Sequence, residues 1–114
     1  DIRRFIKRDS TLIMIGHSFG GCNVCLLGKL LYDNEHNIES IYTFAMPSFT
    51  NKKGMKQIIN KLPLIRIEHS NDYIARLDWN NINKVKYKYR YRFSKNKLQL
   101  IDPYCNNDIL YNNT

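Results

Sequence analysis

The chain has 114 residues, of which 43% are hydrophobic, and its 18 Lys and Arg against 10 Asp and Glu give a formal net charge of +8. This hydrophobic fraction is ordinary for a globular domain and argues against a disordered chain. No apolar run approaches the roughly 18–20 residues that a membrane-spanning helix needs. The excess of cations favours anionic partners, such as nucleic acid or anionic lipid surfaces, and says nothing about the fold.

The three cysteines, Cys22, Cys25 and Cys105, are too few and odd in number for a disulfide framework. Cys22 and Cys25 form a C-x-x-C pair, but no second pair of zinc ligands follows at a suitable spacing. We therefore interpret both as small apolar residues on a buried helix face.

The first third of the chain predicts a strand, a tight turn and a helix. Residues 11–15 form a continuous apolar run, which is typical of a strand buried on both faces of a parallel sheet. Residues 16–21 predict the tight turn. From Cys22 onwards apolar residues recur at helical spacing, and Asp33-Asn34 predicts the end of that helix.

The middle of the chain repeats this alternation of strands and helices. Residues 41–45 predict a second strand that Pro47 stops, and residues 64–67 predict a third. Between them, apolar residues at helical spacing in 55–62 predict a helix that ends before Pro63. The order strand, helix, strand, helix, strand predicts an α/β fold with a parallel sheet and right-handed crossovers.

The pattern then changes to a period of two. From Val85 to Phe93, apolar residues and tyrosines alternate strictly with cations, which predicts a strand with one apolar and one basic face. Apolar residues within 98–101 predict the partner strand of an antiparallel hairpin. We expect the aromatic face to pack inwards and the basic face to meet solvent: Tyr87, Tyr89 and Tyr91 inside, and Lys86, Lys88, Arg90 and Arg92 outside.

Residues 16–20 read Gly-His-Ser-Phe-Gly, which satisfies the G-x-S-x-G pattern of a nucleophile elbow. The motif lies directly after a predicted strand and before a predicted helix, where an elbow belongs. A strained turn at Ser18 requires nearly side-chain-free neighbours two residues before and after it. The alternative is a glycine-rich turn that only packs or that holds a phosphate.

Three blocks of the sequence together resemble the lipase class 3 family, the fungal triacylglycerol lipases. Residues 13–21 (IMIGHSFGG) resemble the family's elbow, and residues 41–47 (IYTFAMP) resemble the strand that follows, with Asn51 at that motif's last position. Residues 64–77 (LIRIEHSNDYIARL) resemble the segment that carries the catalytic acid. The blocks occur in the family's order and span residues 11–78, so the resemblance implies a partial α/β-hydrolase fold.

The resemblance assigns the acid to Asp72. This residue follows the end of a predicted strand, at the edge where Ser18 is also expected. Asp33 and Asp78 are competitors outside the motif, and an Asx-turn is the structural alternative for Asp72. His17 is expected to point away from the nucleophile, His36 lies in a predicted loop, and His69 is awkwardly placed for a base.

The chain departs from the family pattern because no histidine follows Asp72, whereas the required order is Ser, Asp, His. We therefore interpret residues 1–114 as a single partial domain, without the upstream strands and lid and without the downstream histidine segment; a degenerate copy is the alternative. The resemblance implies ester hydrolysis through an acyl-enzyme on Ser18, with the Phe19 N–H in the oxyanion hole and no metal or organic cofactor.

The expected partners are a lipid or another ester as substrate and an anionic membrane surface that attracts the predicted basic face. One alternative function is a catalytically inactive hydrolase-fold protein that binds lipid or a protein partner. A basic nucleic-acid-binding module is less favoured, since strict alternation separates the tyrosines from the cations that a stacking platform would combine on one face.

Overall fold

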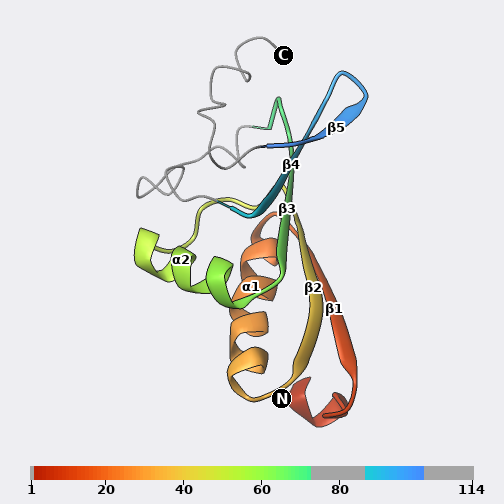
Figure 1. Cartoon of the computed structure of the whole chain (residues 1–114), viewed down its shortest axis with the longest axis vertical. Helices are drawn as coiled ribbons and strands as arrows, with labels where there is room; N and C mark the ends of the chain where they lie inside the picture. The colour runs from red at the N-terminus through yellow and green to blue at the C-terminus, as the bar shows by residue number, and fades with distance from the viewer. Residues whose placement is uncertain (1, 73–86, 102–114) are drawn as a thin grey trace.

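The structure is a computed structural model that describes residues 2–72 and 87–101 (Figure 1). The strands described form one sheet in the order β1-β2-β3-β4-β5, in which β1 to β4 are parallel and β5 is antiparallel to β4. The predicted mixed α/β fold, with parallel strands followed by an antiparallel hairpin, is confirmed. In chain order the elements are η1 (Ile2–Phe5), β1 (Thr11–His17), α1 (Phe19–Asp33), β2 (Asn37–Phe44), α2 (Lys52–Lys61), β3 (Leu64–His69), β4 (Tyr89–Ser94) and β5 (Lys97–Leu100).

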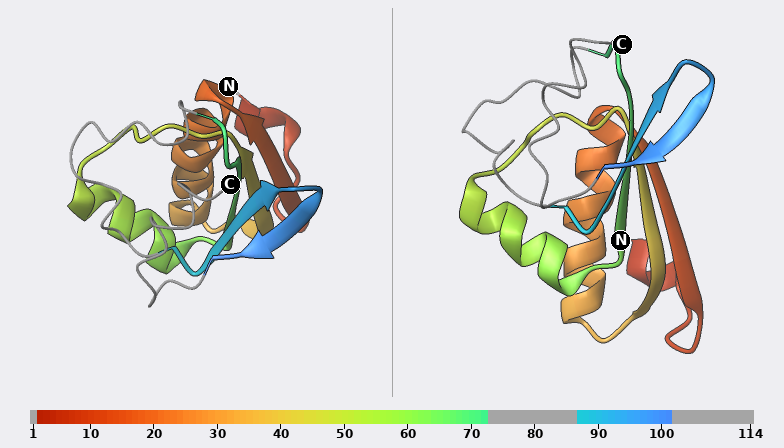
Figure 2. Two further views of the ribbon diagram at one scale, coloured as in Figure 1. Left: turned by 90° about the horizontal axis from the view of Figure 1, so that it is seen from above. Right: turned by 45° about the horizontal axis from the view of Figure 1, so that its top comes forward.

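Both helices cover the same face of the sheet, as the two views in Figure 2 show. This follows from the topology: successive right-handed crossovers between β1, β2 and β3, which advance in one direction, place α1 and α2 on one side. Within the described residues, neither helix is long and apolar enough to cross a membrane. The core lies between helices and sheet, and its buried members include Cys22, Cys25, Ile41, Met46, Met55, Ile58, Ile59, Leu62 and Leu64.

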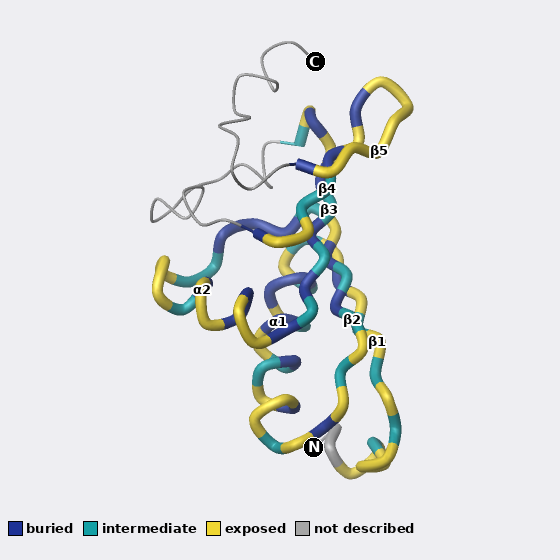
Figure 3. The backbone as a smooth tube through the Cα atoms, in the orientation of Figure 1, coloured by how far each residue is buried: buried dark blue, intermediate teal, exposed yellow. Residues whose placement is uncertain are grey.

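The prediction that the first strand is buried on both faces is wrong for the part of the chain that the structure describes. Most of β1 is exposed or only partly buried (Figure 3). Ile13 and Ile15 are 58% and 65% exposed, because they point to the face of the sheet opposite α1 and α2. Parallel sheets ordinarily have both faces covered. The apolar run therefore indicated the parallel strand, and only one of the two covering layers lies within residues 2–72 and 87–101.

Helix α1 begins at Phe19, three residues before the predicted start at Cys22, and ends at Asp33 as predicted. Its end is a Schellman-type cap: the His36 N–H donates to the Leu31 carbonyl at 3.0 Å, and the Glu35 N–H donates to the Tyr32 carbonyl at 3.0 Å. Glu35 takes the left-handed conformation, with φ of 67°, that this cap requires.

The interpretation of Cys22 and Cys25 as buried, unpaired residues of a helix face is confirmed. The Cys25 Sγ lies 3.7 Å from the Met46 Sδ, inside the core between α1 and the sheet. Burial raises the pKa of the Cys25 thiol to about 12 and also raises the pKa of Cys22. Both thiols are therefore in the protonated, unreactive form at neutral pH.

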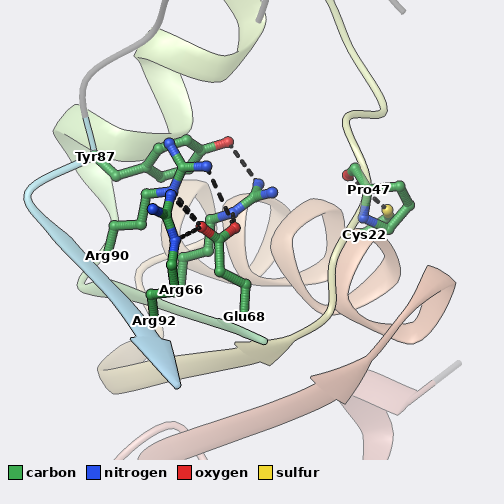
Figure 4. A network of polar contacts seen from close by, with 7 residues as sticks. All are labelled: Cys22, Pro47, Arg66, Glu68, Tyr87, Arg90 and Arg92. Atoms are coloured by element: carbon green, nitrogen blue, oxygen red, sulfur yellow. Dashed lines mark hydrogen bonds and ion pairs between the residues drawn. The ribbon is translucent and has the colours of Figure 1, made fainter. Parts of the chain in front are cut away.

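The strands β3 and β4 are joined by a buried ion cluster around Glu68 (Figure 4). The Glu68 carboxylate is fully buried and accepts hydrogen bonds from the Arg90 Nε at 3.0 Å, the Arg92 Nη2 at 3.2 Å and the Arg66 Nε at 3.4 Å. The Arg66 Nη1 also donates to the Tyr87 hydroxyl at 3.0 Å, and the Arg66 guanidinium lies 4.9 Å from the centre of the Tyr87 ring.

This cluster contradicts the prediction that Arg90 and Arg92 face solvent. The parallel register places Arg90 beside Arg66 and Arg92 beside Glu68, so the cations of β4 point to the face that the helices cover. Tyr89, predicted to pack inwards, is 50% exposed, whereas Tyr87 is buried as predicted. Lys88 is exposed, and Val85 and Lys86 lie outside the described residues.

Replacing Glu68 by Gln should strongly destabilise the fold, because Gln keeps the shape and removes the charge that compensates the buried guanidinium groups. Breaking a buried ion pair in this way typically costs about 3–5 kcal/mol of the free energy of unfolding. Asp33→Asn is the matched control, since it breaks the exposed Lys29–Asp33 pair and should cost less than about 1 kcal/mol. Urea denaturation measures both, and equal losses would contradict the structural role of the cluster.

Candidate active site

Ser18 occupies the sharp turn between β1 and α1 and has a strained backbone, with φ of 55° and ψ of −124°. Such a conformation costs a non-glycine residue on the order of 1–3 kcal/mol, so it persists only where the surroundings hold it. The Ser18 N–H donates to the carbonyl of Phe44, at the end of β2, at 2.8 Å, and the Ser18 carbonyl accepts from the Gly21 N–H at 2.9 Å. Hydrogen bonds to β2 and to the first turn of α1 therefore hold the strained residue.

The glycine before the serine is required by close packing of the backbone. A Cβ at Gly16 would overlap the Gly20 carbonyl oxygen and lie 2.6 Å from the Gly20 carbonyl carbon. The expectation for position 16 is thus confirmed. For Gly20 the packing gives no such reason, because a Cβ there would meet no atom of the described chain within 4 Å apart from its chain neighbours and the backbone of its own helix. Gly21 is the tighter position, since its Cβ would lie 3.0 Å from the Met46 Cβ.

Phe19 is the first residue of α1, so its N–H has no acceptor within the helix. This N–H directly follows Ser18, and the positive end of the helix dipole adds to its attraction for negative charge. The first turn of α1 is therefore suited to stabilise an oxyanion that develops at Ser18.

Asp72 follows β3 and lies at the same edge of the sheet as Ser18. The parallel register aligns His17 of β1 with Phe44 of β2, and Phe44 with Ile67 of β3, so Ser18 and Asp72 both follow strands that end at this edge. Strands β1 and β3 are separated by β2, and two strand spacings amount to about 10 Å. An imidazole ring that bridges a serine hydroxyl and a carboxylate would occupy such a gap.

A cavity of about 520 Å³ opens at this carboxyl edge, on the face of the sheet that α1 and α2 leave uncovered. Its polar lining residues include His17, His69 and Asp72, whereas most of the remaining lining is apolar. The apolar part of the lining is formed by Phe44, Ala45, Ile67, Phe93 and Leu98.

Within residues 2–72 and 87–101, no group of three or more His, Cys, Asp or Glu side chains is arranged to hold a metal ion.

The three histidines of the chain occupy different places. His36 precedes β2 and lies at the opposite, amino edge of the sheet, where it is buried. His17 ends β1 and is exposed. His69 ends β3, and its Nδ1 accepts a hydrogen bond from the Asn71 N–H at 3.1 Å. In a catalytic triad the Nδ1 instead carries a hydrogen and donates it to the acid, so His69 has the opposite arrangement from a triad base.

Ser18→Gly should stabilise the protein relative to Ser18→Ala, because glycine adopts a positive φ without steric cost. The relief of strain, partly offset by the larger entropy of glycine in the unfolded chain, should amount to about 1 kcal/mol. At Ser40, inside β2, the glycine variant should instead be less stable than the alanine variant, since glycine weakens a strand. Denaturant unfolding of the four variants measures this, and a less stable Ser18→Gly would argue against backbone strain at the elbow.

Comparison with known proteins bears on this arrangement. The family model described as Lipase (class 3) matches residues 1–81 of the 114 residues. A comparison with curated proteins gave no match. The family match covers more than half of the chain and contains both Ser18 and Asp72. The chain therefore belongs to the class 3 lipase family.

Proposed function

We propose that the protein is a serine carboxylic-ester hydrolase of the lipase type, with Ser18 as nucleophile and Asp72 as acid. Membership in the class 3 lipase family indicates a lipase-like ester hydrolase. The observation that carries the serine mechanism is the strained Ser18 at the start of α1, on the same sheet edge as Asp72. Strain of this kind concentrates at functional sites.

In the proposed reaction, a histidine takes the proton of the Ser18 hydroxyl while the Ser18 Oγ attacks the ester carbonyl carbon. The carbonyl oxygen becomes an oxyanion, to which the Phe19 N–H donates. Collapse of the intermediate expels the alcohol, which receives the proton from the histidine, and leaves an acyl group on Ser18. Water then attacks the acyl-enzyme in the same way and releases the carboxylic acid.

The base in this proposal is a histidine outside the 114 residues. No histidine follows Asp72 in the sequence, whereas this fold orders its triad Ser, Asp, His. His69, the nearest histidine to Asp72 in sequence, uses its Nδ1 as an acceptor for the Asn71 N–H. These observations also favour a second candidate function, a hydrolase-fold protein without turnover that binds lipid or another partner.

The apolar cavity at the carboxyl edge supports a substrate with an apolar portion, such as an acylglycerol or a phospholipid. Contact with an anionic membrane stays a prediction, but Arg90 and Arg92 no longer support it, since both pair with the buried Glu68. The same pairing takes two of the four predicted cations out of the basic strand face on which the nucleic-acid alternative depended.

Turnover of a p-nitrophenyl ester tests the proposal. In the full-length protein, Ser18→Ala and Asp72→Asn should each lower kcat by about 10⁴-fold or more, because triad members act as a unit. Asp33→Asn is the matched control, since this exposed carboxylate at the end of α1 lies away from the carboxyl edge, and its turnover should be unchanged.

The isolated 114 residues should show little or no turnover, since they lack the proposed base. Robust hydrolysis by the isolated chain that Ser18→Ala abolishes would contradict the assignment of the base to a residue outside it. His69 and His17, which line the same cavity as Asp72, would then be the candidates for the base.

A further inference from the structure

His69, at the end of β3, accepts two of the backbone hydrogen bonds in the turn that carries Asp72. We propose that His69 is a positioning residue that holds this turn, and with it the proposed catalytic acid, through the acceptor atom Nδ1. The functional part of this inference rests on the proposed function; the structural part does not.

Local hydrogen bonds satisfy the backbone donors of the three residues after His69. The Ser70 N–H donates to the carbonyl of Phe93 on β4 at 3.1 Å, and the Asp72 N–H donates to the His69 carbonyl at 3.1 Å. The Asn71 N–H, between them, donates to the His69 Nδ1 at 3.1 Å. The backbone that leads to Asp72 therefore has a partner for each consecutive donor, and one of these partners is a side chain.

The imidazole ring of His69 is itself fixed by the neighbouring strand. Its centre lies 5.7 Å from the centre of the Phe93 ring, at an interplanar angle of 47°, which is within the range of favourable aromatic pairs. Phe93 is also the residue opposite His69 in the β3–β4 register. The acceptor that holds the turn is therefore tied to the sheet, and the turn cannot shift without breaking this packing or the hydrogen bond.

The direction of the hydrogen bond distinguishes positioning from catalysis. A backbone N–H is always the donor, so the His69 Nδ1 carries no hydrogen, and the neutral ring holds its hydrogen on Nε2. A triad base needs the hydrogen on Nδ1 to donate to the acid. His69 therefore acts on Asp72 through the backbone. A catalytic triad tolerates only displacements well below 1 Å. Loosening this turn would therefore lower the rate of ester hydrolysis by about 10- to 100-fold.

Two substitutions separate the roles of His69. In His69→Asn, the side-chain Oδ1 stands as many bonds from Cα as the imidazole Nδ1 and can accept from the Asn71 N–H, but the side chain can no longer act as a base. His69→Leu keeps an apolar contact with Phe93 and removes the acceptor. Because His69 is exposed, neither change threatens the fold.

Amide hydrogen exchange in the full-length protein provides the first measurement. His69→Leu should speed exchange at the amides of Asn71 and Asp72, whereas His69→Asn should leave both protected, and ¹⁵N NMR of the wild-type ring should show the hydrogen on Nε2. Unchanged protection in His69→Leu, or a hydrogen on Nδ1, would overturn the proposal whether or not the protein is an ester hydrolase.

Ester turnover by the full-length protein provides the second measurement. His69→Leu should lower kcat by about 10- to 100-fold, and His69→Asn should restore it to within a few-fold of the wild type. A loss in His69→Asn as large as in Ser18→Ala would make His69 the base and overturn the positioning role. If the wild type shows no Ser18-dependent turnover, the proposed function fails, while the exchange measurement still decides whether His69 holds the turn.

Discussion

The close approach of Gly16 to the backbone of Gly20 is the constraint on which the site depends. Any side chain at position 16 would overlap the Gly20 carbonyl, so only glycine allows β1 to turn into α1 within one residue. That residue is Ser18, which bears the resulting strain at φ of 55°. The start of α1, the orientation of the Phe19 N–H and the position of the Ser18 hydroxyl all follow from this contact.

A second constraint, the buried Glu68, explains why the predicted orientation of the strand with the period of two is wrong. A period of two shows which residues of a strand share a face, but it does not show which face meets the core. Tyrosines beside arginines suggested an aromatic core, whereas the carboxylate of Glu68 holds Arg90 and Arg92 on the covered side of β4. The available signal was the pair Arg66 and Glu68 within an otherwise apolar strand, since such charges need partners when they are buried.

The order and type of most elements, and the shared edge of Ser18 and Asp72, were predictable from the sequence because parallel strands that alternate with helices end at the same edge. The start of α1 was missed because Gly20 and Gly21 are poor helix formers, although tertiary packing makes them helical. The uncovered face was missed because an apolar run does not show which part of a protein covers it. The arrangement of His69 depends on a hydrogen bond that its side chain accepts from the backbone N–H two residues later in the chain. No sequence pattern predicts this bond.

Covalent labelling is the decisive test of the proposal that Ser18 is an activated nucleophile. A fluorophosphonate probe reacts with activated serines and forms a stable adduct, which peptide mass spectrometry locates in the full-length protein. We expect one adduct, on Ser18, that forms in the folded protein and not after denaturation. An adduct on another serine, or ester turnover without any adduct on Ser18, would contradict it.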